Sequence, residues 1–99
     1  MRARREALGW AQEKVGVLIG IDESSSRARI SRYELGTHEP PVKTARLLAQ
    51  ALGVPLAYLY CDDDGVAELL LRLHELDAAA ASRVVEQAMA FAAQARGEG

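Results

Sequence analysis

Residues 12–36 read QEKVGVLIGIDESSSRARISRYELG, and this stretch decides the fold. Its first part predicts a short helix over residues 12–19, because apolar residues recur at helical spacing up to Gly20. A cluster of residues that favour helix starts, at 22–26, begins a second helix, which Gly36 is expected to end. The stretch therefore predicts two helices joined by a tight turn, the second of them rich in arginine.

The apolar side chains of these two helices indicate which faces turn inward. In the first helix, Val15, Leu18 and Ile19 share one face. In the second helix, a wheel drawn at about 100° per residue turns Ile30 and Tyr33 toward the core. Both helices are therefore expected to bury one side against the rest of the chain.

The opposite arc of the second helix carries arginines and small residues, namely Arg27, Ala28, Ser31 and Arg32, with Arg29 at the margin. Arginine can hydrogen-bond a guanine edge through two bonds, and small side chains permit close approach to DNA. The arc is therefore suited to reading bases in a major groove, with an ordinary solvated arginine face as the alternative. Arg29 is better suited to a phosphate contact or a structural ion pair.

The rest of the chain also predicts helices rather than strands. Its 18 Ala and 13 Leu residues far outnumber the 12 Val, Ile and Thr residues taken together, and this balance favours helix. Glycines and prolines divide the sequence into short segments, as is typical of closely spaced helices. Further helices are expected over residues 2–8, 42–52 and 55–60.

The C-terminal part predicts a hairpin of two helices. The first follows three aspartates, which suit helix capping better than metal binding, and its apolar residues have i, i+3, i+4, i+7 spacing. The last helix runs from Asp77 to about Ala95 with alanine at nine of nineteen positions, so its surface allows close helix approach. The hairpin is therefore either a dimer interface or a lid on the first five helices. The residues concerned are Asp62, Asp63 and Asp64, then Val66, Leu69, Leu70, Leu73 and Leu76.

The charges are divided unequally between the two halves of the 99-residue chain. Residues 1–50 carry a balance of +3 and residues 51–99 a balance of −5, which together give a net charge of −2. A basic half in an acidic protein favours a nucleic-acid partner, although ordinary surface charge would give the same balance. No stretch has the length and apolar character of a membrane span or a secretory signal, so we expect a cytoplasmic protein without membrane contact.

The residues that could carry catalysis or bind a metal lack their usual partners. His74-Glu75 and His38-Glu39 both lack the second histidine, four residues after the first, that a zinc protease motif requires. Cys61 is the one cysteine, which excludes an internal disulfide and a cysteine-based zinc site. The sequence also lacks a glycine-rich phosphate loop. We therefore expect no enzyme activity, no cofactor and no metal site.

Taken together, the motifs in residues 1 to about 60 resemble the Cro/lambda-repressor-like helix-turn-helix family, also called XRE-type regulators. The resemblance implies a five-helix DNA-binding domain in residues 1–60, followed by a C-terminal helical extension, 61–99, as a candidate dimerisation element. The fold expected for the whole chain is thus all-α. The matching positions are Gln12-Glu13, Val15-Gly16, Ile19-Gly20-Ile21, Ile30 to Glu34, Gly36, Pro40 and Ala49 to Val54.

The resemblance also implies roles for individual residues. Arg27, Ala28 and Arg32 match positions that read bases, in agreement with the helical wheel. Arg5 and Glu34 match a structural ion pair that ties the first helix to the third. Gln12 looks like a phosphate or outer-base contact at the start of its helix. The loop after the arginine-rich helix would meet the DNA backbone through Thr37, His38 and Lys43.

The chain departs from the family pattern in the turn. The segment between Gly20 and Ile30 is four residues longer than usual, and four residues make about one helical turn. We therefore expect the third helix to begin near Asp22, with Ser24 and Ser25 toward the DNA backbone and Glu23 away from it. An irregular loop over residues 22–25 is the alternative. In addition, Ala11 replaces the family's Ser or Thr cap, which costs about 1 kcal/mol of capping.

These observations favour a sequence-specific DNA-binding transcriptional regulator, acting as a homodimer on a two-fold operator in double-stranded DNA. Repression by covering a promoter is the simplest mode of action. Two alternatives remain, an antitoxin of a toxin–antitoxin pair and a protein-interaction module that keeps the fold without reading DNA. Both predict a protein partner, which an antitoxin would bind through the acidic C-terminal half.

Overall fold

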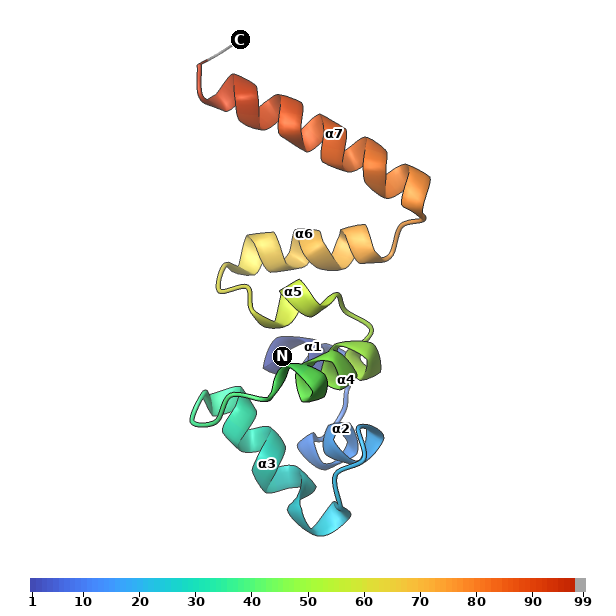
Figure 1. Ribbon diagram of the computed structural model, residues 1–99, viewed down its shortest axis with the longest axis vertical. Coiled ribbons are helices and arrows are strands. Elements are labelled where there is room, and N and C mark those ends of the chain that lie inside the picture. The colour runs from blue at the N-terminus through green and yellow to red at the C-terminus, as the bar shows by residue number, and fades with distance from the viewer. Residues whose placement is uncertain (98–99) are drawn as a thin grey trace.

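In the computed structural model, which describes residues 1–97, the chain forms seven helices and no strand (Figure 1). The all-α class predicted from the sequence is therefore confirmed. Within the described range, no helix has the length and apolar character needed to cross a membrane. The helices are α1 (Arg2–Ala7), α2 (Gln12–Leu18), α3 (Glu23–Leu35), α4 (Val42–Leu52), α5 (Leu56–Leu59), α6 (Asp64–His74) and α7 (Ala78–Ala95).

The core lies among α2, α3 and α4. Val15 of α2, Ile30 of α3 and Leu48 of α4 are fully buried, which matches the inward positions expected for Val15 and Ile30. Leu52 and Val54 extend this cluster, and Leu71 of α6 packs on its edge. The expected apolar face of α2 is wrong at one residue, since Leu18 is exposed while Ile19 packs against the core. Leu18 instead lines a surface hollow together with Leu47 of α4.

Several helix ends agree with the sequence prediction. The predicted helix over residues 42–52 has those bounds in the structure. Gly36 and Gly53 end α3 and α4 in the left-handed conformation, with φ of 76° and 67°, where a side chain would be strained. Asp63 and Asp77 cap α6 and α7 through their carboxylates, as expected.

The helix α3 contains the extra turn that the long 20–30 segment predicted. It begins at Glu23, so the helical alternative is confirmed and the irregular loop over residues 22–25 is excluded. Asp22 stands at the N-cap position, but its carboxylate accepts a hydrogen bond from the Ser24 hydroxyl rather than from a backbone N–H. A local side-chain contact thus stands at the start of the extension in place of a carboxylate cap.

The helices α2 and α3 are in close contact at Gly16 and Ser26. Both residues are buried, and the Ser26 hydroxyl donates a 2.7 Å hydrogen bond to the carbonyl of Glu13. A Cβ atom at position 16 would lie 1.8 Å from the Ser26 oxygen and 2.8 Å from its Cβ. The spacing of the two helices thus requires glycine at position 16.

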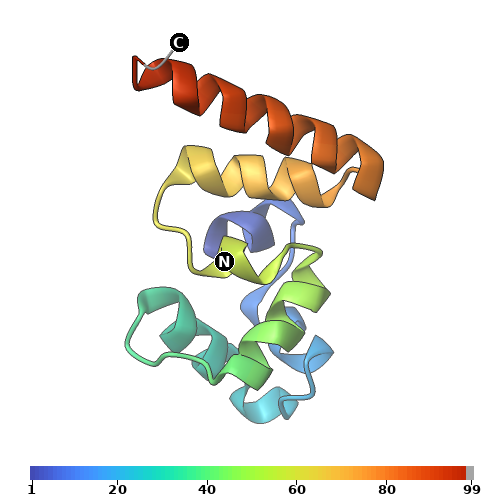
Figure 2. The same ribbon diagram turned by 45° about the horizontal axis from the view of Figure 1, so that its top comes forward.

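The helix α6 packs against the first five helices through a different face from the predicted apolar stripe. Leu71, which lies outside the expected stripe, is the buried residue of α6, whereas Val66, Leu69 and Leu76 are exposed. The side chains of α6 are apolar over more than half of its circumference, and the five-helix unit covers the part that contains Leu71. The helix α6 therefore lies on the first five helices, while α7 lies beyond it at the far end of the molecule from α2 and α3 (Figures 1 and 2).

We expect Gly16→Ala to lower the free energy of unfolding by about 2 kcal/mol, because the added methyl group overpacks the α2–α3 contact. Its better helix propensity, about 1 kcal/mol, offsets this loss only in part. Urea unfolding followed by circular dichroism measures the change. In the double variant Gly16→Ala/Ser26→Gly the loss should be smaller than the sum of the two single losses, and simple additivity would contradict the close contact.

Candidate nucleic-acid interface

The outward side of α3 carries most of the residues that the helical wheel selected. Arg27, Ala28, Arg29 and Arg32 are exposed, while Ser31 is half-buried. Leu35 is 71% exposed on the same side, and it was not among the residues predicted from the sequence. Continuing the wheel by one turn would have found Leu35, because it falls on the arc between Arg27 and Arg32.

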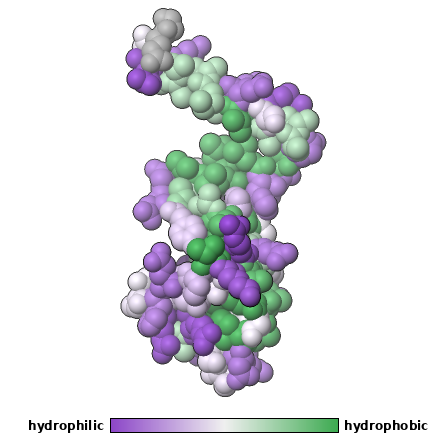
Figure 3. Space-filling model, viewed as in Figure 1, coloured by the Kyte–Doolittle hydropathy of each residue, from purple (hydrophilic) through white to green (hydrophobic). Residues whose placement is uncertain are grey.

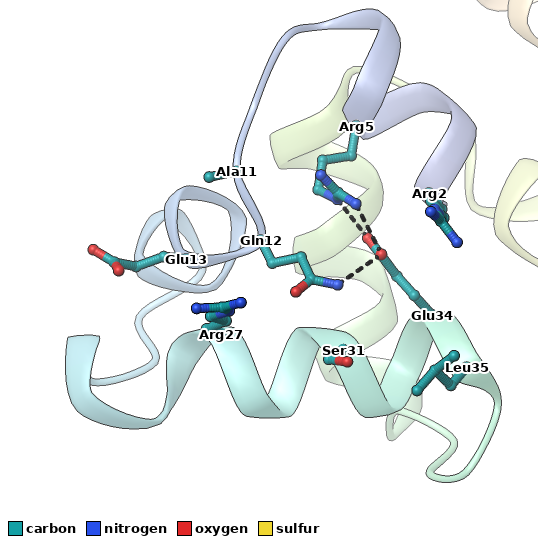
Figure 4. A pocket seen from close by; sticks show the side chains of 9 residues that line it. All are labelled: Arg2, Arg5, Ala11, Gln12, Glu13, Arg27, Ser31, Glu34 and Leu35. Carbon is teal, nitrogen blue, oxygen red and sulfur yellow. Dashed lines mark hydrogen bonds and ion pairs between the residues drawn. The ribbon is translucent and has the colours of Figure 1, made fainter.

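A hollow of about 580 Å³ lies between the start of α2 and this side of α3 (Figure 4). It brings Gln12 together with Arg27 and Ser31, three residues that the sequence had marked separately. Its mixed lining of guanidinium, amide, hydroxyl and apolar groups can bind a polar, charged surface. The other lining residues are Arg2, Arg5, Ala11, Glu13, Glu34 and Leu35. Of these, only Arg5 and Glu34 were predicted from the sequence as functional or structural residues.

An ion pair at the back of the hollow joins α1 to α3. Arg5 donates to both carboxylate oxygens of Glu34, over 2.6 Å from Nε and 3.0 Å from Nη2 (Figure 4). A third guanidinium nitrogen, Nη1, donates over 2.8 Å to the carbonyl of Trp10. The side chain of Glu34 is only 4% exposed and that of Arg5 12% exposed. The structure thus brings Arg5 and Glu34 together with little exposure to water. A guanidinium that donates two hydrogen bonds to one carboxylate forms one of the stronger polar contacts in proteins.

The surroundings of this pair shift the pKa values of both groups. Burial raises the pKa of Glu34, but hydrogen bonds from Arg5 and Gln12 and the nearby positive charges outweigh burial, so the net pKa lies below the ordinary value. The hydrogen bond to Glu34 raises the pKa of Arg5. Both groups are therefore held in their charged forms.

Gln12 has a structural contact that its sequence position did not reveal. Its side-chain nitrogen donates to Glu34 over 3.1 Å and so links the first turn of α2 to α3. An amide nitrogen carries two N–H groups and the amide oxygen accepts further bonds. Gln12 therefore retains one N–H and its oxygen for a ligand in the hollow while it is held in place by Glu34.

The expected backbone contacts lie at several separate places. Ser24 is exposed and Ser25 half-buried at the start of α3. Thr37 donates to the carbonyl of Arg32 over 3.3 Å and so closes the end of α3. His38 lines a second hollow, beside Tyr60, and Lys43 is exposed at the start of α4. The structure does not bring His38 or Lys43 into the hollow that holds Gln12 and Arg27.

Comparison with known proteins gives a matching family model, a similar solved structure and two curated relatives. The family model described as Helix-turn-helix matches residues 1–59. The crystal structure of the transcriptional regulator BswR is similar over 99% of this chain and 94% of that one, with a TM-score of 0.77 and 36% sequence identity. The similarity to BswR thus includes the C-terminal helices as well as the first five.

Two curated relatives are HTH-type transcriptional regulators, from Sinorhizobium medicae and Rhizobium meliloti, both described as uncharacterized. Each is 34% identical over 65 residues, which make up 66% of this chain and 44% of the relative. The matched segment therefore spans less than half the length of these two relatives.

We expect Arg5→Ala to lower the free energy of unfolding by about 3 kcal/mol, because it leaves the carboxylate of Glu34 buried without its main partner. Arg2→Ala is the matched control. Arg2 pairs with Glu6 on the surface of the same helix, where its side chain is 70% exposed, and such pairs contribute about 0.5 kcal/mol. Chemical denaturation of both variants measures the difference. Equal losses in the free energy of unfolding would contradict the view that the buried Arg5 pair stabilises the fold more than the surface Arg2 pair.

Because the pKa of Glu34 is lowered in the folded protein, we expect the free energy of unfolding to depend on pH. A carboxyl group with a folded-state pKa below its unfolded value stabilises the fold above the unfolded pKa, about 4.3 for Glu. This contribution is lost as the pH falls through the lower, folded-state pKa. The stability gap between the wild type and Glu34→Gln should therefore narrow as the pH is lowered from 7 toward 3 in urea titrations. A gap that stays constant over this range would contradict the shift.

Proposed function

Because the chain belongs to the helix-turn-helix family, we propose that it is a DNA-binding transcriptional regulator that reads a specific sequence as a homodimer. In this proposal α3 is the recognition helix and enters the major groove. Residues 1–60 bind DNA, and residues 61–99 hold the two copies together. In this proposal the protein works in the cytoplasm.

The observation that carries this proposal is the outward side of α3. Arginines alternate there with small and apolar residues, and no acidic residue lies among Arg27, Ala28, Ser31, Arg32 and Leu35. Arg27 and Arg32 can each form two hydrogen bonds with a guanine edge. Ala28 and Leu35 suit contact with thymine methyl groups, and Ser31 suits a hydrogen bond to a base edge.

The surrounding polar residues suit the DNA backbone. Gln12 stands at the start of α2 with part of its amide free, where helix N–H groups also favour a phosphate. Arg29 flanks the recognition face, and Ser24 and Ser25 precede Arg27 in the first turn of α3. In the proposal these four residues, together with Thr37, His38 and Lys43, bind sugar and phosphate and fix the register of α3.

The dimensions of the chain are compatible with two copies on adjacent half-sites. The molecule measures 56 × 27 × 24 Å along its principal axes. Half-sites one helical turn apart are separated by about 34 Å, so two copies fit side by side across their shorter dimensions. We propose that such a dimer acts as a repressor, since a bound dimer covers the promoter DNA that polymerase needs.

An antitoxin, or a protein-interaction module that keeps the fold, is the second candidate. The observation that favours a protein partner is the C-terminal part of the chain, which is acidic and exposes large apolar side chains such as Met89 and Phe91. An antitoxin would still read DNA through α3, whereas a pure interaction module would not. Co-purification with the product of an adjacent gene would favour either of these.

Selection of bound sequences from random duplex DNA tests DNA reading, and we expect an enriched inverted repeat. Arg27→Ala and Arg32→Ala should each lose about 1–3 kcal/mol of discrimination between the selected site and a scrambled control, because each removes one two-bond base contact. The matched control is Arg83→Ala, which removes an exposed arginine of α7. Fluorescence anisotropy across salt concentrations gives the affinities.

Two results would contradict the proposal. Unchanged discrimination in both α3 variants would overturn the assigned base contacts. Recovery of no sequence motif, with only weak and salt-sensitive binding, would favour the protein-interaction module over a sequence reader.

A further inference from the structure

We propose that Arg2, at the start of α1, is a further DNA-binding residue, and that it binds a phosphate of the same DNA strand that Gln12 contacts. The proposal rests on the DNA binding proposed above and adds the helix α1 to the surface that meets the duplex. Because the group that Arg2 recognises is a backbone phosphate, it contributes affinity for DNA of any sequence.

Arg2 lies on the side of α3 along which a DNA backbone would run. It lines the same hollow as Gln12, Arg27 and Ser31. Figure 4 shows α1 and the start of α2 along one side of α3, with Arg2 toward the Leu35 end of the hollow. A helix in the major groove, which is about 12 Å wide, has a phosphate backbone on each side of it. The backbone on this side therefore passes both Gln12 and Arg2.

The guanidinium of Arg2 retains donors for a ligand. Its Nε donates to Glu6 over 2.7 Å, while Nη1 and Nη2 form no hydrogen bond with the part of the chain that the structure describes. The side chain of Arg2 is 70% exposed. A guanidinium can bind a phosphate through two parallel hydrogen bonds. Arg2 can therefore bind a phosphate through its terminal nitrogens without losing the bond to Glu6.

The other two arginines of α1 are engaged in the fold. Arg4 donates over 2.8 Å to a carbonyl at the end of α4. Arg5 uses all three of its nitrogens, two on Glu34 and one on the carbonyl of Trp10. Arg2 is thus the arginine of this helix that an external anion can reach.

The charges around the hollow favour an anion at its Arg2 end. Of the two carboxylates that line it, that of Glu34 is paired with Arg5, and that of Glu13 lies at the opposite end (Figure 4). Glu6 pairs with Arg2 from outside the hollow, but its side chain is 54% exposed. Water and salt screen an ion pair that is exposed on both sides, so Arg2 still attracts a phosphate.

DNA matches the chemistry of this end of the molecule. On the face that Figure 3 shows, hydrophilic side chains gather over α3, whereas apolar side chains gather along α6. The hollow has a volume of about 580 Å³, within the range of sites that hold a drug-sized molecule, so it can take a stretch of sugar and phosphate. Each DNA strand offers one phosphate for about every 3.4 Å of rise. Neighbouring phosphates of one strand can therefore serve Gln12 and Arg2.

Fluorescence anisotropy of the full chain across salt concentrations tests the proposal, with the selected duplex and a scrambled duplex as probes. We expect Arg2→Ala to weaken binding to both duplexes by the same factor, roughly three- to tenfold, and to reduce the salt slope of log K by about one. Arg2→Lys should restore the slope, because the positive charge returns. Circular dichroism checks that each variant is folded.

Two controls separate a phosphate contact from other effects of the substitution. Arg72→Ala removes an arginine of the same exposure, 70%, which also pairs with a glutamate four residues away, but on α6. Glu6→Gln breaks the ion pair of Arg2 while leaving its guanidinium in place. We expect neither control to reduce the affinity or the salt slope as Arg2→Ala does.

Methylphosphonate substitution of the selected duplex, one phosphate at a time, locates the contact. At one position the neutral group should weaken binding of the wild type but have no further effect on Arg2→Ala, because the contact is already absent there. We expect a neighbouring position on the same strand to behave in this way with Gln12→Ala.

The outcomes separate this inference from the proposed function. An Arg2→Ala variant that binds like Arg72→Ala, or a loss that Glu6→Gln reproduces, would overturn the inference. If Arg27→Ala still lost discrimination, the proposed function would stand. A loss confined to the selected duplex would assign Arg2 to a base instead of a phosphate and would also overturn the inference.

Failure of sequence reading has a different signature. If selection recovered no motif, the proposed sequence reading would fail, while the salt slope on any bound duplex would still decide the role of Arg2. A wild type that bound neither duplex would overturn both proposals.

Discussion

The ion pair between Arg5 and Glu34 is the interaction on which the arrangement of the first three helices depends. Its carboxylate is almost completely buried, so it requires every donor that reaches it: two from Arg5 and one from Gln12. These donors come from α1 and from the first turn of α2, whereas Glu34 belongs to α3. One charged group therefore sets the position of three helices relative to each other.

The contact between Gly16 and Ser26 constrains the other end of α3. At the Glu34 end, polar bonds determine the distance between the helices; at the Ser26 end, the absence of a side chain at position 16 lets the backbones approach. Because α3 is held at both ends by contacts on its inner side, its outer side contributes little to the packing of the helices. Arg27, Ala28 and Arg32 can consequently be replaced without loss of the fold, which suits their proposed role in reading bases.

The sequence predicted most of the helices because their ends depend on local chemistry. Gly36 and Gly53 end helices through backbone conformation, and Asp63 and Asp77 begin them through capping, all of which can be read from a few neighbouring residues. The extra turn of α3 was predictable for the same reason.

The errors concern packing, which local sequence does not determine. The helix α6 is apolar around more than half of its circumference, so periodicity could not show that Leu71 meets the five-helix unit. At the candidate interface, the wheel found the arginines of α3, whereas the bond of Gln12 to Glu34 depends on how α2 and α3 pack against each other.

The alanine content of α7 has a consequence for the speed of assembly. A helix that leaves its own domain must keep its shape largely through intrinsic propensity, and alanine has the highest propensity of any residue. Nine of its 18 residues are alanine. A segment that is already helical loses little conformational entropy when it docks, so encounter need not wait for the chain to order. The same alanines that make the helix thin thus preorganise it for the pairing of two copies proposed above.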